Sequence, residues 1–159
     1  MDLRKRGVQM NKIMDNNHFI KWIPHSDVVA VYDMEDIGWR NEGFVLTLFP
    51  DDLDHDKRSE YNFEMIWPDV LCYQVTNERY RPDLWVSSPD EAWTFYTSES
   101  SKFLENFRKD NELVPDTVYH FIVGGTNFVI DILSAEYPKV RFVKRTSKID
   151  KNKPSDTEK

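Results

Sequence analysis

The sequence predicts an α+β fold, in which a mainly antiparallel sheet of about five to seven strands is packed by one long helix. Three observations support this fold class. Short apolar segments separated by turn residues recur through residues 19–77, as is typical of antiparallel strands. Helix-start signals followed by roughly helical apolar spacing occupy residues 88–111. The apolar segments of residues 117–143 then predict a C-terminal β-α-β unit.

Short segments in the first half are expected to form an antiparallel meander. They are residues 19–24, 28–34, 43–50, 62–68 and 71–77. In the third of these, Phe44, Leu46 and Leu48 recur at every second position and therefore face one side of a strand. The Gly and Asn within residues 36–43 are typical of a hairpin connection.

The long helix is predicted from its N-terminal signals. Ser88 suits an N-cap, Pro89 suits the first helical position, and Glu91 completes a capping box. Apolar residues then follow at near-helical spacing: Trp93, Tyr96, Phe103, Leu104 and Phe107. The stretch TSESS, residues 97–101, is poor helix material and allows a kink or a second start at Ser98. The helix should end near Asn111, before Pro115.

The C-terminal unit is expected to begin with a strand at residues 117–123, broken by two glycines. Residues 127–138 are apolar almost throughout, so their pattern fits a strand or a helix. A helix is favoured, because Val129, Ile132 and Leu133 have helical spacing and Pro138 would end it. Residues 139–143 would form the last strand.

The chain should form one domain with two tails. Its 159 residues are 40% hydrophobic and 14% aromatic, enough for one sizeable core. Residues 18–143 are expected to form a single globular α+β domain. Residues 1–17 are predicted to be a flexible segment, and residues 144–159 a disordered basic tail whose one apolar residue is Ile149.

The formal net charge of −7 hides an uneven distribution. Residues 1–21 hold five Lys or Arg and two Asp, and residues 139–159 hold eight Lys or Arg and three acids. Residues 22–138 are left with eight basic and 23 acidic residues. A body this acidic repels nucleic acid and anionic membranes and attracts basic surfaces, although acidity can also serve solubility alone.

The stretch DDLDHD, residues 51–56, raises the question of a calcium site. An EF-hand loop needs a glycine at its sixth position and a glutamate at its twelfth, where this chain has Lys57 and Phe63. Two basic residues, Lys57 and Arg58, would also lie beside any bound ion. A solvated loop between strands is therefore favoured over a metal site.

Other catalytic or cofactor patterns are absent from the sequence. The four histidines have no metal-ligand spacing, and Cys72 is the only cysteine, which excludes an intrachain disulfide. His120 within an apolar strand is most simply a core histidine, and no sequence pattern pairs it with Cys72. FIVGGTN, residues 121–127, lacks the spacing of a phosphate-binding loop. We therefore expect no metal, no cofactor and no assignable catalytic residue.

The function favoured by these observations is that of a non-enzymatic acidic protein that covers a basic surface on a partner protein. It would be an immunity protein or antitoxin, or a phage-type inhibitor of a nucleic-acid-acting enzyme, without direct nucleic-acid or membrane binding. The chain resembles bacterial immunity proteins only in its small size, acidity and lack of a catalytic motif. Without a secretory signal or a long apolar stretch, a cytoplasmic location is expected, in a bacterium or a phage-infected cell.

Carboxylates and one aromatic anchor make up the candidate binding site. The residues are Asp33, Glu35, Asp36, Trp39 and Glu42 in one hairpin, and Asp51, Asp52, Asp54 and Asp56 in the next loop. In a meander these two turns lie at opposite ends of strand 43–50, so they form one patch only if the loop folds back.

Two alternatives remain open. The chain could be a small enzyme or ligand-binding domain, with a pocket between sheet and helix lined by Trp67, Tyr73, Trp93 and Tyr96. The same aromatic residues are also those that a core needs. A structural or assembly component is the third possibility.

Overall fold

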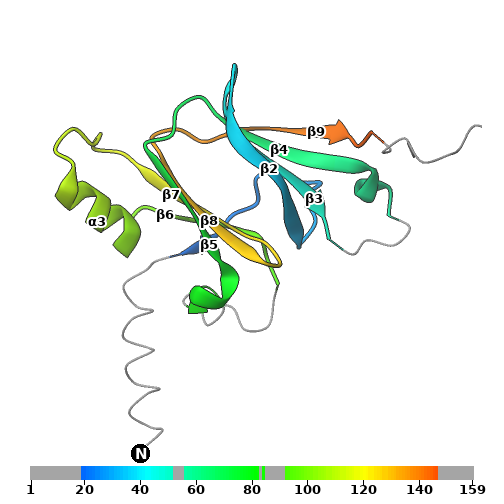
Figure 1. The fold of residues 1–159 in the computed structure, drawn as a ribbon, viewed down its shortest axis with the longest axis horizontal. Helices are drawn as coiled ribbons and strands as arrows, with labels where there is room; N and C mark the ends of the chain where they lie inside the picture. The colour runs from blue at the N-terminus through cyan, green and yellow to red at the C-terminus, as the bar shows by residue number, and fades with distance from the viewer. Residues whose placement is uncertain (1–18, 52–55, 83, 85–91, 147–159) are drawn as a thin grey trace, which may run out of the picture.

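The computed structural model describes residues 19–51, 56–82, 84 and 92–146, which form two antiparallel sheets (Figure 1). Sheet A runs in the order β1 (Ile20–Lys21), β6 (Phe95–Ser98), β7 (Tyr119–Gly124), β8 (Phe128–Ser134) and β5 (Cys72–Asn77). Sheet B runs in the order β2 (Tyr32–Arg40), β3 (Gly43–Pro50), β4 (Tyr61–Trp67) and β9 (Lys139–Lys144). The described residues also include the helix α3 (Lys102–Asp110) and two 3₁₀ turns, η1 (Lys57–Glu60) and η2 (Glu78–Tyr80).

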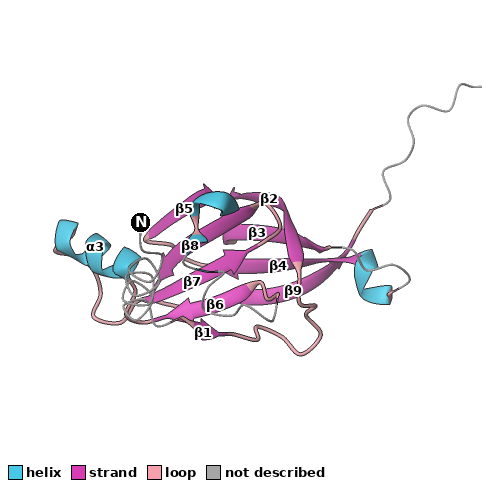
Figure 2. Cartoon of the chain, turned by 90° about the horizontal axis from the view of Figure 1, so that it is seen from below, coloured by secondary structure: helices cyan, strands magenta, loops and turns pink. Residues whose placement is uncertain are grey.

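The main core lies between the two sheets. Alternate residues of β3 and β4, among them Leu46 and Phe63, are fully buried against side chains from sheet A. Ring centroids of Phe63 and Phe95 lie 5.7 Å apart, and those of Trp67 and Phe121 lie 5.5 Å apart. These aromatic contacts join the inner faces, so the protein is a two-layer sheet packing with α3 at one end of sheet A (Figure 2).

The coarse fold prediction is confirmed, because the structure is mostly antiparallel sheet with a helix. The predicted strand 43–50 is β3, and strands 62–68, 71–77, 117–123 and 139–143 correspond to β4, β5, β7 and β9. The segment 28–34 differs, because β2 begins only at Tyr32 and continues through the predicted connection to Arg40. The meander ends after β4, since β5 crosses to sheet A and pairs with β8.

The predicted long helix is wrong in its first half. Residues 95–98 form the strand β6, in which Phe95 is fully buried in the core between the sheets. The helix begins only after Ser101, whose side chain caps it, and covers nine residues. The predicted signals at Ser88, Pro89 and Glu91 lie outside the described residues.

The predicted C-terminal β-α-β unit is also wrong. Residues 128–134 form β8, a central strand of sheet A paired with β7 on one side and β5 on the other. All seven residues of β8 are buried, which explains a continuous apolar pattern without a helix. With nine strands among the described residues, the expected range of five to seven is too low.

The predicted tails, residues 1–17 and 144–159, fall largely outside the described part of the chain. The last described residues include Arg145, whose N–H donates to the carbonyl of Glu60 at 2.8 Å. Within the described residues, no helix combines the length and apolar character needed to cross a membrane.

Candidate interaction surface and a buried polar network

The strand β2 is one edge of sheet B and carries three of the predicted acidic residues. A bulge between Met34 and Asp36 adds a residue to β2 relative to β3. It leaves Glu35 and Asp36 exposed beside the half-buried Asp33. Tyr32, Met34 and Ile37 face the core, so these carboxylates lie on the outer face of sheet B. Their arrangement makes β2 an acidic edge strand.

Polar contacts hold these carboxylates in place. Glu35 accepts a hydrogen bond from the side-chain amide of Asn62 at 2.7 Å, and Asp36 forms an ion pair with Arg40. At the two-residue turn after β2, the Glu42 carboxylate accepts two hydrogen bonds from the Arg141 guanidinium, at 2.8 and 3.1 Å. Because the carboxylates and arginines in these contacts are exposed, the contacts are screened by solvent and contribute little to stability. They do fix where the charge lies.

The opposite edge of sheet B is basic. Residues 139–145 include four cations, Lys139, Arg141, Lys144 and Arg145, and no carboxylate. Glu64 and then Glu42 hydrogen-bond to Arg141 and raise its pKa. Sheet B is therefore polarised from an acidic edge at β2 to a basic edge at β9; Figure 2 shows these two strands on opposite sides of β3 and β4.

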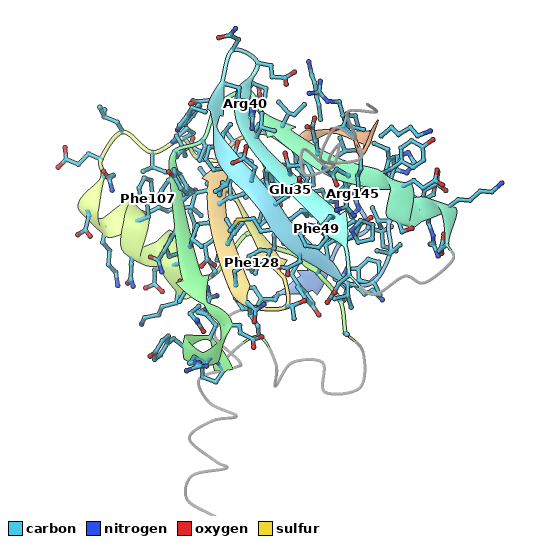
Figure 3. The ribbon with its side chains drawn as sticks, turned by 45° about the vertical axis from the view of Figure 1, so that its right-hand side comes forward. Glu35, Arg40, Phe49, Phe107, Phe128 and Arg145 are labelled. Carbon is cyan, nitrogen blue, oxygen red and sulfur yellow. The ribbon has the colours of Figure 1, made fainter. Side chains whose placement is uncertain are left out.

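A hollow of about 730 Å³ on the outer face of sheet B contains groups of both charges. Its lining includes Glu35 and Asn62 together with the cationic Lys144 and Arg145. Figure 3 shows Glu35 on β2 and Arg145 after β9. The Arg145 guanidinium lies 5.3 Å from the ring centroid of Phe49. The outer face thus offers a polar hollow bordered by the two charged edges.

Exposed aromatic side chains adjoin the acidic edge. Trp39 on β2 is 55% exposed, and Tyr73 on β5, the nearby edge of sheet A, is 44% exposed. Both pack against the buried Phe44, with ring centroids 5.4 and 4.6 Å from it. Val75 on β5 is also exposed. Large half-exposed aromatics on a rigid core are the residue types that anchor protein interfaces.

The remaining predicted acids lie elsewhere. Asp51 follows β3 at the end opposite the β2–β3 turn, and it accepts a hydrogen bond from Thr126 at 2.7 Å. Asp56 caps η1 and pairs with Arg58 at 2.7 Å, a hydrogen bond that lowers the pKa of Asp56. Asp52 and Asp54 lie outside the described residues. Among the described candidates, the structure brings together Asp33, Glu35, Asp36, Trp39 and Glu42 in the β2 hairpin, and places Asp51 and Asp56 apart from them.

A cavity of about 230 Å³ is lined in part by Gly124, the last residue of β7, and by Gly125, which follows it. Its lining includes Asp51, Glu78, Trp93, Gly124 and Thr126. Two carboxylates make this cavity unsuited to a phosphate, in agreement with the missing phosphate-loop spacing. Of the four aromatic residues predicted to line a pocket, Trp93 alone is among the residues that line this cavity. Trp67 lies fully buried in the core.

A buried polar network that no sequence pattern predicted joins α3 to sheet A. Ser101 Oγ lies 2.6 Å from His120 Nδ1, and His120 Nε2 lies 2.7 Å from Asp131 Oδ1. The other carboxylate oxygen of Asp131 accepts a hydrogen bond from Arg81. Three of these residues, Ser101, His120 and Asp131, are almost fully buried. On folding, these polar groups therefore replace hydrogen bonds to water with hydrogen bonds to one another.

The network has the members of a Ser-His-carboxylate triad, but its geometry is that of a buried structural hydrogen-bond network. Ser101 Oγ accepts a hydrogen bond from Leu104 N–H at 3.1 Å and so caps α3. The ring of His120 meets the ring of Phe19 edge-on and lies tilted against the ring of Phe103. Ser101 is 2% exposed, so a substrate cannot reach its hydroxyl in this conformation. The residues come from separate elements at no recognisable spacing, which is why sequence patterns missed them.

Cys72 lies near this network without joining it. Cys72 and His120 both pair with Leu133, on opposite sides of β8, so the leucine separates them. Burial, and secondarily the charge of Asp131, raise the pKa of the Cys72 thiol. The pKa of the Cys72 thiol is therefore higher in the folded chain than in the unfolded chain. Its contribution to the stability of the fold is fully present below the pKa of the unfolded chain and is lost as the pH rises through the pKa of the folded chain.

We expect Cys72 to react slowly with iodoacetamide, because the thiolate is the reactive form. Near pH 8, alkylation of the folded chain should be at least about threefold slower than that of the urea-unfolded chain. Mass spectrometry of quenched samples measures both rates, with glutathione under the same conditions as the reagent control. Equal rates in folded and unfolded chains would contradict the raised pKa.

Comparisons with known proteins add no relative: no protein-family model, no curated protein and no solved structure matches the chain. Within the described residues, no group of three or more His, Cys, Asp or Glu side chains is arranged to hold a metal ion. The site must therefore be interpreted from its own geometry.

Proposed function

We propose that this protein binds a basic surface of a partner protein through the β2 hairpin, as a non-enzymatic acidic inhibitor. The observation that carries the proposal is the combination, on one edge strand, of Asp33, Glu35 and Asp36 with the exposed Trp39. Carboxylates on an exposed strand accelerate the encounter with a cationic partner. The neighbouring aromatic residues, Trp39 and Tyr73, would then provide the desolvated centre of the interface.

A partner with a cationic active site fits this surface best. Two kinds are proposed: a toxin neutralised by an immunity protein or antitoxin, and a nucleic-acid-acting enzyme blocked by a phage-type inhibitor. In both, a row of carboxylates would take the place of phosphates on the partner's basic groove.

The alternative function, a small enzyme or ligand-binding domain, draws its support from the cavity lined by Asp51, Glu78 and Trp93. Two carboxylates beside an indole ring suit a small cationic ligand. The sealed Ser101–His120–Asp131 network adds nothing to this function in the folded conformation.

The test is capture of a partner from lysate at low salt, its identification by mass spectrometry, and measurement of its association rate with the purified chain. Replacing Asp33, Glu35 and Asp36 by Asn, Gln and Asn should lower that rate about tenfold at low ionic strength. The matched control replaces Asp110, Glu112 and Asp116, three exposed acids at the end of α3 and just after it, by the corresponding amides. This control removes the same total charge and should change the rate much less.

Two results would overturn the proposal. One is an equal effect of the two triple variants, which would show that net charge and not the β2 edge attracts the partner. The other is an association rate that does not change between about 0.05 and 0.5 M salt, because electrostatic steering is screened over this range.

A further inference from the structure

We propose that copies of this chain associate edge to edge, with β2 of one copy pairing with β9 of the next. Each of these strands has a neighbouring strand on one side only among the described residues, β3 for β2 and β4 for β9. An edge strand presents unpaired N–H and C=O groups along its free side. In the described part of the chain, sheet B thus has two edge strands with no strand paired on their outer side, which Figure 2 shows at opposite ends of the sheet.

Strand direction makes the two edges compatible. Sheet B contains four strands, and each is antiparallel to its neighbour. In an antiparallel sheet with an even number of strands, the two edge strands run in opposite directions. A second copy translated along the sheet would therefore place its β9 antiparallel to β2 of the first, with both outer faces on the same side. The joint continues the sheet without changing its hydrogen-bonding pattern.

Charge favours pairing of β2 with β9 over the two symmetric pairings, β2 with β2 and β9 with β9. The β2 hairpin, residues 32–42, holds four carboxylates and one arginine, whereas residues 139–145 hold four cations and no carboxylate. Pairing β2 with β2, or β9 with β9, would bring like charges together, and directly opposed like charges destabilise a sheet. Pairing β2 with β9 brings opposite charges together.

Charged side chains from both edges, among them Asp36 and Arg141, share the outer face of sheet B. Asp36 pairs with Thr47, Thr47 with Glu64, and Glu64 with Arg141, so this row of residues projects from the same side of sheet B. Across the joint, Asp33 and Asp36 would lie beside the cations of the next copy, among them the exposed Lys139. The bulge at Met34/Asp36 leaves Asp36–Arg40 as the longest regular stretch of β2. Because the contact is short, the association should be weak and sensitive to salt.

This inference goes beyond the proposed function while using the same edge. A head-to-tail joint leaves one β2 and one β9 edge free, so assembly continues past the dimer unless it closes into a ring. A partner bound to β2 would block the joint. Self-association and partner binding are then mutually exclusive.

Sedimentation velocity of the full chain tests the inference. At about 0.05 M salt the mean mass should rise with protein concentration, and at about 0.5 M salt it should fall back to that of the monomer. Two charge-reversal variants are needed. One is D33K with E35K, which leaves the Asp36–Arg40 pair intact; the other is K139E with K144E and R145E, which makes residues 139–145 net acidic and leaves the ion pairs of Arg141 intact.

Each reversal variant should be monomeric alone, because its two edges then carry the same sign. An equimolar mixture of the two should associate, since the reversed β2 of one variant matches the reversed β9 of the other. Far-UV circular dichroism confirms that both variants fold. Restored association in the mixture supports the proposal in a way that damage to either variant cannot imitate.

Three results would overturn self-association: a wild-type chain that is monomeric at every concentration, a reversal variant that associates as well as wild type, or a mixture that stays monomeric. A monomeric wild-type chain that still captures a partner through β2 would assign this edge to a foreign protein. In that case the proposed function would stand and this inference would fail.

Discussion

Replacing Asp131 with alanine should lower the free energy of unfolding by about 3–5 kcal/mol, the usual cost of breaking a buried ion pair from one side. The Asp131 side chain is 1% exposed and hydrogen-bonds to both His120 and Arg81. Its loss would leave the arginine charge and the imidazole N–H without this acceptor in a site largely closed to water. Urea unfolding followed by tryptophan fluorescence measures the change.

The matched control is Asp36→Ala, which removes the same side chain from another Asp–Arg pair. The pair of Asp36 and Arg40 is exposed, with 55% of the Asp36 side chain accessible. Exposed pairs contribute about 0–1 kcal/mol, so this variant should unfold close to wild type. A similar loss in both variants, or a small loss for Asp131→Ala, would contradict a stabilising role for the buried network.

Strands with strict alternation could be predicted from sequence. In β3 and β4, residues such as Leu46 and Phe63 face the core, while their neighbours Thr47 and Glu64 face outward. In these strands the apolar residues that recur at every second position are the ones packed between the two sheets. Turn residues between strands confirmed the boundaries, which is why residues 43–50 were predicted to the residue.

The C-terminal half could not be predicted in the same way, because its strands are buried on both faces. Ile130 packs between the sheets, whereas its neighbour Val129 belongs to an apolar cluster on the other face of sheet A. Such a strand shows no alternation, and its apolar residues fit helical spacing equally well. In β6, pairing with β1 and β7 fixed the conformation against local helix signals.

The candidate surface could be predicted only where its residues are close in sequence. Residues 33–42 are neighbours in sequence, so a hairpin was enough to group Asp33, Glu35, Asp36, Trp39 and Glu42. The basic edge could not be foreseen, because it requires β9 to pair with β4, as Glu64 and Arg141 do across a wide gap in sequence. The buried network likewise depends on tertiary contacts between Ser101, His120, Asp131 and Arg81.

Replacing Gly43 with alanine should lower the free energy of unfolding by about 2–4 kcal/mol, from backbone strain and overpacking together. Gly43 follows the two-residue turn between β2 and β3 and has φ of 129°, a conformation that only glycine adopts readily. A Cβ at this position would lie 2.2 Å from the carbonyl oxygen of Trp67, which is backbone and cannot rotate away. The turn would have to open, and β3 would lose its alignment with β4 at the end beside the acidic hairpin.

Gly38→Ala is the control, because it adds the same methyl group within the same hairpin. An added Cβ at Gly38 would have no heavy atom within 4 Å, and this glycine has no positive φ. Alanine there should be neutral or stabilising by about 0.5–1 kcal/mol, because it reduces the entropy of the unfolded chain. The urea concentrations at the unfolding midpoints of the two variants, compared with wild type, test this prediction. Equal shifts would mean that the φ of Gly43 and its contact with Trp67 do not set the requirement for glycine, whereas a loss confined to Gly43→Ala supports that requirement.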